Sequence, residues 1–161
     1  MRSPLVVAKA LALLVPAVAL AAAFGSQYLG HLVPCEMCWW QRYAHLAALP
    51  FALAAWLAGP GRGRPLVWLA ALAIAVSGGI GFYHAGVELG IFPGFTQCTA
   101  QVAAGGSPDD LLKAIMDAPM VRCDQVQWSL FGISMAGWNA ILSLGGALMV
   151  LWFSRKPANP A

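Results

Sequence analysis

The sequence predicts an all-α membrane protein built as a bundle of four transmembrane helices. Of its 161 residues, 60% are hydrophobic and only 9% are charged. A soluble domain carries about 25% charged residues, so this chain has too few charges to cover its surface in water. Its apolar residues fall into four long runs, each close to the roughly 20 residues that cross the hydrocarbon core of a bilayer. We therefore expect lipid to surround most of the chain.

The first apolar run, residues 5–27, predicts the first transmembrane helix. A secretory signal peptide is the alternative, because Arg2 and Lys9 could form its charged region and the alanines at 21–23 its cleavage site. The run is long for the apolar part of a signal peptide, which favours a helix that stays in the mature protein.

Three further apolar runs predict the remaining helices, at residues 39–58, 66–87 and 130–153. Residues 59–65, rich in glycine and proline, predict a tight turn between the second and third runs. The third run is rich in small residues around Ser77, Gly78 and Gly79. Small residues let helices pack closely in lipid, so we expect a close helix contact there.

Two polar segments are expected on one side of the membrane: a short loop, residues 28–38, and a long loop, residues 88–129. The long loop contains Ser107 followed by a proline and two aspartates, which is typical of a helix start. An apolar face follows, and Pro119 ends the segment. A helix this short would lie parallel to the membrane and not cross it. The whole chain, residues 1–161, is then a single domain.

The charged residues predict the orientation of the helices. If the helices alternate in direction, 6 of the 9 basic residues fall on one side: Arg2, Lys9, Arg62, Arg64, Arg155 and Lys156. All 6 acidic residues fall on the other side: Glu36, Glu88, Asp109, Asp110, Asp117 and Asp124. Basic residues favour the cytoplasmic side, so both termini are expected in the cytoplasm. Both loops then face outward, which for a bacterial inner membrane is the oxidising periplasm.

Composition also limits the function. The net charge of +3 is too small to indicate a nucleic-acid partner, and no basic run with interleaved aromatic residues is present. The 4 cysteines are too few for a disulfide scaffold, but they are enough for two redox pairs. The cysteines are therefore the first candidates for chemistry.

Cys35 and Cys38 form a C-x-x-C motif where the short loop meets the second apolar run. Pro34 suits a helix start, so both cysteines are expected in the first helical turn. A helix N-terminus stabilises the thiolate, which is the reactive form of cysteine. Arg42 lies four residues after Cys38, on nearly the same helix face and one turn deeper. It could stabilise the Cys38 thiolate or bind a ligand carbonyl, although a snorkelling interfacial arginine is the alternative.

Cys98 and Cys123 both fall in the long loop. The segment before Cys98 carries no signal for regular structure, and a cysteine in such a segment is accessible to an incoming thiol. A structural disulfide is the alternative for each pair of cysteines. A tetrahedral zinc site made from all four is a further alternative, although the spacing lacks a second C-x-x-C. C-type haem attachment would need a histidine directly after Cys38, and Trp39 stands there.

Two histidines fall within the apolar runs. His84 lies near the outer end of the third run. It could be a hydrogen-bond or proton partner of a redox ligand, or only an interfacial polar residue. His45 lies seven residues after Cys38, on the same helix face and deeper in the membrane, where polar residues tend to be functional. We expect His45 to form a helix–helix hydrogen bond.

The residues described above resemble the DsbB family. Its members are bacterial inner-membrane proteins that reoxidise the periplasmic dithiol oxidase DsbA and pass the electrons to quinone. The resemblance covers essentially the whole chain and rests on an ordered set of residues. The set is Pro34-Cys35-x-x-Cys38 followed by Gln41-Arg42, then His84, then Pro93 and Phe95 before Cys98, then Cys123 followed by Gln127-Trp128 and Phe131-Gly132. The C-x-x-C motif alone is weakly specific, whereas this set with four expected helices is specific.

The resemblance implies a role for each cysteine. Cys98 would be attacked by the reduced DsbA-like partner and would form a mixed disulfide with it. Cys123 would then be released and could attack Cys35 of the C-x-x-C disulfide. Cys38 would become the thiolate that faces the quinone ring. A Cys35–Cys123 bond between the loops is plausible during turnover.

The resemblance also implies a quinone cofactor, either ubiquinone or menaquinone. Arg42 matches the family's quinone-associated arginine, and His84 matches a histidine near the same site. The expected activity is that of a protein dithiol:quinone oxidoreductase, whose partners are the DsbA-like protein, the quinone pool and the lipid bilayer. Glu36 and Met37 between the cysteines are more acidic than the apolar pair of the family's type member, which bears on the redox potential and not on the reaction class.

Two other functions compete with this interpretation. The vitamin K epoxide reductase family also uses loop cysteines and a membrane-adjacent C-x-x-C, but its loop cysteines come first in the chain, and here the order is reversed. A small membrane subunit with a structural disulfide or metal site is the non-enzymatic alternative. Turnover would separate this subunit from both enzymes.

Overall fold

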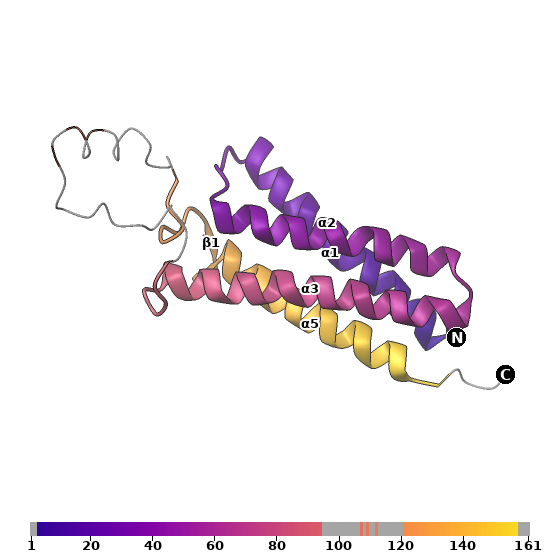
Figure 1. Cartoon of the computed structure of the whole chain (residues 1–161). Coiled ribbons are helices and arrows are strands. Elements are labelled where there is room, and N and C mark those ends of the chain that lie inside the picture. The colour runs from indigo at the N-terminus through magenta and orange to yellow at the C-terminus, as the bar shows by residue number, and fades with distance from the viewer. Residues whose placement is uncertain (1–2, 95–106, 108, 110–111, 113–120, 158–161) are drawn as a thin grey trace.

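The computed structural model describes residues 3–94, 107, 109, 112 and 121–157. Within these residues the chain forms α1 (Pro4–Tyr28), α2 (Glu36–Leu57), α3 (Pro60–Glu88), β1 (Ser129–Leu130), β2 (Ile133–Ser134) and α5 (Met135–Arg155). The helices lie side by side in an elongated bundle, in which α1 begins and α5 ends at the same end (Figure 1). The predicted helical fold class is confirmed for the described residues.

Three of these helices are long and apolar enough to cross a membrane: Pro4–Tyr28, Arg62–Glu88 and Met135–Arg155. The chain is therefore a membrane protein. Helix α2 also has 22 residues, but it carries Gln41, Arg42 and His45 and is not among these three. Their side chains are 7%, 5% and 3% exposed, so they face the interior of the bundle. A membrane crossing by α2, which would complete four spans, stays a prediction.

Small residues fill the contacts between the helices. One buried cluster takes alanines and valines from α1, α2, α3 and α5: Ala8, Ala12, Ala52, Ala55, Val67, Ala70, Ala71 and Val150. Side chains this small let helix backbones approach closely, which favours association in lipid. At Gly78 of α3, an added Cβ would lie 2.8 Å from Leu144 Cγ of α5. The predicted close contact is confirmed at Gly78, whereas a Cβ at Gly79 would meet nothing within 4 Å.

Two helix starts differ from the sequence-based expectation. The sequence predicts a turn over residues 59–65, but α3 already begins at Pro60, since the first amide groups of a helix need no intrahelical partner and proline is tolerated there. The fourth apolar run predicts helix from residue 130, but β1 and β2 form a hairpin that pairs Leu130 with Ile133. Phe131 and Gly132, with φ of 53° and 77°, make its tight turn. Apolar content does not distinguish such a hairpin from the first turn of a helix.

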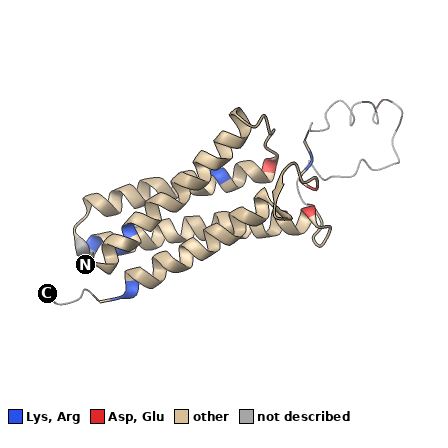
Figure 2. Ribbon diagram, turned by 180° about the vertical axis from the view of Figure 1, so that it is seen from behind, with Lys and Arg blue, Asp and Glu red and all other residues tan. Residues whose placement is uncertain are grey.

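Charge divides between the two ends of the bundle (Figure 2). Lys and Arg gather mainly at the end where α1 begins and α5 ends, and the acidic residues lie at the opposite end. Lys9 Nζ donates a hydrogen bond to Ala58 O at 3.3 Å, which ties the connection between α2 and α3 to this basic end. Most of the short helix predicted in the long loop, together with Cys98, falls outside the described residues.

Candidate functional site

The C-x-x-C motif lies at the start of α2. Cys35 is the N-cap residue, and its sulfur accepts a hydrogen bond from the Cys38 backbone N–H at 3.4 Å. The two sulfurs lie 3.0 Å apart and are not joined by a disulfide. Cys35 is buried, whereas Cys38 is half-buried. The motif therefore begins the helix as predicted, with Cys35 just outside the first turn.

Cys123, from the segment that precedes β1, lies against this motif. Its sulfur, the Cys35 sulfur and a ring nitrogen of His84 all lie within 4.8 Å of one another. All three side chains are buried. A hydrogen bond with Cys123, a second with Cys38 and burial together raise the pKa of the Cys35 thiol above its usual range. The neutral thiol of Cys35 is therefore favoured over its thiolate in this arrangement.

The zinc alternative can be tested against this geometry. Tetrahedral zinc with Zn–S bonds of about 2.3 Å holds two ligand sulfurs about 3.8 Å apart. The Cys35 and Cys38 sulfurs are closer, at 3.0 Å. Cys98, which a four-cysteine site would need, lies outside the described residues. The Cys35–Cys38 pair therefore lacks the spacing of two zinc ligands, whereas Cys35, His84 and Cys123 lie close enough together to hold a metal ion.

A cavity of about 690 Å³ adjoins the cysteines and is bounded by residues of α1, α2, α3 and α5. Cavities of about 300–1,000 Å³ are typical of small-molecule sites. Apolar residues form most of its lining. The lining residues with thiol, hydroxyl, amide, imidazole or charged side chains are Ser26, Cys35, Cys38, Gln41, Arg42, His45, His84, Glu88, Arg122, Gln125, Gln127 and Asn139. Cys38 and Arg42 thus share one cavity, as their helical spacing predicts.

Arg42 is held in this cavity wall by helix α1. Its guanidinium donates to the Gln27 side chain and, at 2.9 Å, to the backbone oxygen of Ala23. The rings of Phe24 and Trp39 each have their centroid 4.9 Å from the guanidinium carbon. The side chain is buried. It therefore does not extend to the membrane surface, as a snorkelling arginine would.

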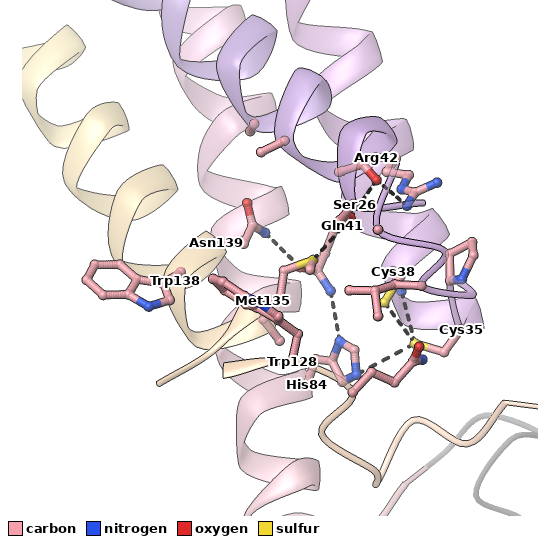
Figure 3. A pocket seen from close by; sticks show the side chains of 18 of the residues that line it. Ser26, Cys35, Cys38, Gln41, Arg42, His84, Trp128, Met135, Trp138 and Asn139 are labelled. Atoms are coloured by element: carbon pink, nitrogen blue, oxygen red, sulfur yellow. Dashed lines mark hydrogen bonds between the residues drawn. The ribbon is translucent and has the colours of Figure 1, made fainter. Parts of the chain in front are cut away.

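His84 lies between the thiols and a second group of polar side chains (Figure 3). Its Nε2 is 3.6 Å from Cys35 Sγ and 3.8 Å from Glu88 Oε1. Its Nδ1 is 3.0 Å from Gln41 Nε2. Gln41 in turn accepts a hydrogen bond from Asn139 Nδ2 of α5 at 2.8 Å. The imidazole thus contacts one cysteine directly and is joined to α5 through Gln41.

The sequence profile described as "Disulfide bond formation protein DsbB" matches residues 7–153 of this chain. The chain belongs to the DsbB family. A relative named "Disulfide bond formation protein B" from Aromatoleum aromaticum is 32% identical over 138 residues, which cover 80% of this chain and 82% of the relative. A protein of the same name from Marinobacter nauticus is 31% identical over 140 residues, which cover 81% of this chain and 80% of that relative. No solved structure matches this chain.

The cavity residues of this DsbB-family chain that were not identified as site residues from the sequence include Gln41, Glu88 and Asn139. A signal for Asn139 existed, because a lone amide within an apolar run usually faces the bundle interior. In the sequence analysis Glu88 was used only as an acidic residue of the long loop that indicates the orientation of the helices. Its side chain is 8% exposed, however, and its Oε2 has no hydrogen-bond partner among the described residues.

His45 forms the expected helix–helix hydrogen bond. Its Nε2 lies 3.0 Å from Asn139 Oδ1 and 3.3 Å from Ser143 Oγ, both on α5. This prediction is confirmed. The other ring nitrogen, Nδ1, is buried and has no partner among the described residues.

Proposed function

We propose that this DsbB-family chain is a quinone-dependent protein thiol oxidase. It would reoxidise a DsbA-like periplasmic dithiol protein and pass the electrons through two cysteine pairs to the membrane quinone pool. The observation that carries the proposal is the place of the C-x-x-C pair. The Cys35 and Cys38 sulfurs lie 3.0 Å apart, and both residues line the cavity of about 690 Å³. Electron transfer from protein thiols to a lipid-soluble carrier requires a redox-active cysteine pair in contact with the site where the carrier binds.

In this proposal the electrons travel by thiol–disulfide exchange. A thiolate of the reduced partner attacks Cys98 of a Cys98–Cys123 disulfide, and the broken bond leaves its electron pair on Cys123. Cys123 then attacks Cys35, and the broken Cys35–Cys38 bond leaves its electron pair on Cys38. The Cys35 and Cys123 sulfurs lie within 4.8 Å of each other, which supports this order.

The residues around the cavity fit a quinone. The apolar lining suits its ring and isoprenoid tail, and the permanent charge of Arg42 suits a carbonyl oxygen. His45 Nδ1 and Glu88 Oε2, on two residues that line the cavity, are buried without a partner among the described residues. A ligand can supply the hydrogen bond that such a group lacks. A bound quinone, ubiquinone or menaquinone, would accept the two electrons and two protons that a dithiol releases.

The proposed location is the bacterial inner membrane, with both termini in the cytoplasm and the cysteines on the periplasmic side. The separation of basic from acidic residues along the bundle supports this orientation (Figure 2). The 22 residues of α2 are enough to cross the hydrocarbon core beside the other helices. Four spans would then place both loops in the oxidising compartment, where disulfides persist.

Reconstitution with quinone and a reduced periplasmic dithiol protein tests this function. One quinone should be reduced for each disulfide formed. Cys38→Ser should stop quinone reduction, and Cys98→Ser should stop engagement of the partner. Ser154→Ala is the control, because it removes two hydrogen bonds at the basic end of the bundle, one accepted from Trp68 Nε1 at 2.9 Å and one donated to Leu151 O at 2.8 Å. Normal turnover by both cysteine variants would contradict the assignment, and a chain without any turnover would be a structural subunit.

A further inference from the structure

The orientation of the Gln41 side-chain amide is set by its neighbours. Its Nε2 donates a hydrogen bond to Met37 O at 3.1 Å, and a carbonyl oxygen can only accept. Its Oε1 accepts from Asn139 Nδ2 at 2.8 Å. Asn139 Nδ2 also donates to Ser77 O at 3.2 Å, which fixes the Asn139 amide in turn. If nitrogen and oxygen were exchanged in the Gln41 amide, its oxygen would face the Met37 carbonyl oxygen, and in the Asn139 amide the oxygen would face the Ser77 carbonyl oxygen. Two acceptors cannot form a hydrogen bond, so only one orientation of each amide fits its neighbours.

This arrangement selects one form of the His84 ring. The second hydrogen of Gln41 Nε2 points to His84 Nδ1, 3.0 Å away, so Nδ1 must accept. A neutral imidazole carries its hydrogen on the other nitrogen when one accepts. That nitrogen, Nε2, lies 3.6 Å from Cys35 Sγ. His84 therefore offers a hydrogen-bond donor, and not a base, to the sulfur of Cys35.

We propose that Gln41 is a positioning residue that holds His84 with its hydrogen on Nε2, and that His84 donates this hydrogen bond to the negative charge that forms on Cys35 when a disulfide to Cys35 opens. The inference rests on the proposed function, because thiol–disulfide exchange is what puts charge on this sulfur. In that step the partner closes its own disulfide and leaves Cys98 as a thiolate, which attacks Cys123 and forms the Cys98–Cys123 disulfide. The Cys35–Cys123 bond breaks, and its electron pair stays on Cys35 as a thiolate. No further oxidant or reductant takes part.

The surroundings of Cys35 show why a donor matters there. Cys35 is 4% exposed, so water cannot solvate a charge on its sulfur. Its titratable neighbours are Cys38 on α2, His84 and Glu88 on α3, and Cys123 on the incoming segment. Apart from His84 these groups are thiols or a carboxyl, and the positive charge that acts on Cys35 electrostatically is that of Arg42, further along α2. The Cys38 backbone N–H already donates to this sulfur at 3.4 Å, and among the neighbouring side chains the His84 N–H is the donor that does not itself become an anion.

Nitrogen-15 NMR of the histidine rings tests the first half of the proposal, on the full chain in lipid nanodiscs. The chain has 3 histidines, which single substitutions can assign. We expect His84 Nε2 to carry the hydrogen at neutral pH. Gln41→Leu should populate both neutral forms, and Gln41→Glu, whose carboxylate only accepts, should place a hydrogen on Nδ1. Ser154→Ala should leave the His84 signals unchanged. A hydrogen on His84 Nδ1 in the unaltered protein would overturn the proposal without any variant.

Alkylation of Cys35 tests the second half. In a chain with Cys38, Cys98 and Cys123 replaced by serine, the rate of reaction with iodoacetamide is measured against pH. Losing a hydrogen bond to a charged group should slow alkylation at a fixed pH about tenfold and move the profile to higher pH. Gln41→Leu and His84→Leu should each have this effect, and the double variant should be no slower than His84→Leu. Additive effects, or an unshifted profile, would overturn the proposal.

Neither measurement uses quinone or a partner protein. A chain that shows the expected His84 form and Cys35 profile, but reduces no quinone in the reconstitution described above, would contradict the proposed function and support the assignment of Gln41 and His84. If instead the chain reduces quinone but the Cys35 profile is unshifted in Gln41→Leu, the proposed function is supported and the assignment of Gln41 and His84 is contradicted.

Discussion

Arg42 Nη2 donates a hydrogen bond to the backbone oxygen of Ala23, 2.9 Å away on the neighbouring helix α1. The same guanidinium donates to the side chain of Gln27, one turn further along α1. The one permanent cation in the cavity lining of α2 is therefore held in place before any ligand arrives. Its position does not depend on the ligand, so its charge is available to a carbonyl at little cost in ordering.

Arg42→Ala should raise the apparent quinone KM more than it lowers kcat. Loss of a charge-assisted hydrogen bond costs about 1.5–3 kcal/mol, which corresponds to a rise in KM of about tenfold or more. Arg64→Ala is the matched control, because Arg64 is exposed and lies near the start of α3, at the basic end. Steady-state reduction of quinone by the reconstituted protein measures KM and kcat for both variants. An unchanged quinone dependence in Arg42→Ala would remove this residue from the site.

Gly78→Ala should destabilise the bundle. The new Cβ would lie 2.8 Å from Leu144 Cγ and 3.0 Å from the Leu144 backbone nitrogen, so α3 and α5 would have to separate. Overpacking of this kind costs about 1–3 kcal/mol. Gly79→Ala is the neighbouring control, since its Cβ meets nothing within 4 Å, and it should be neutral or slightly stabilising. Thermal unfolding in detergent compares the two, and equal transition temperatures would argue against a close contact at Gly78.

Asn139→Leu should cost more stability than His45→Leu. Removing the Asn139 amide leaves Gln41 Oε1 without its partner on α5, at about 1–3 kcal/mol, and leaves the His45 ring with only Ser143 Oγ of its two partners there. Removing the His45 ring leaves Asn139 Oδ1 still bonded to Ser143 Oγ at 2.9 Å, so the cost should stay below about 1 kcal/mol. Thermal unfolding of the two variants measures the difference. The reverse order would mean that the polar network is centred on His45.

Cysteine labelling in whole cells should show the orientation of the chain. With the native cysteines replaced, Ser107→Cys in the long loop should react with a membrane-impermeant maleimide in intact cells. Lys156→Cys, just after α5, should react only after lysis, because basic residues favour the cytoplasmic side. Labelling of Lys156→Cys in intact cells would invert the proposed topology.

The sequence by itself determines the local features of this protein. Composition and the apolar runs identify a helical membrane protein, and the glycine at position 78 marks a close helix contact. The spacing of Cys35, Cys38 and Arg42 places a thiol pair and a cation on one short stretch of helix. These features are readable because the helical period and the transfer of side chains into lipid act over a single turn or a single run of residues.

Only the tertiary structure decides which distant residues meet. It brings Cys123 to Cys35, joins His84 to Gln41 and Asn139, and turns Arg42 toward α1. Each of these contacts depends on how far one helix is rotated about its axis relative to the next, and on where a loop returns the chain. No sequence spacing encodes these quantities, because small shifts in packing across several helix interfaces set them together.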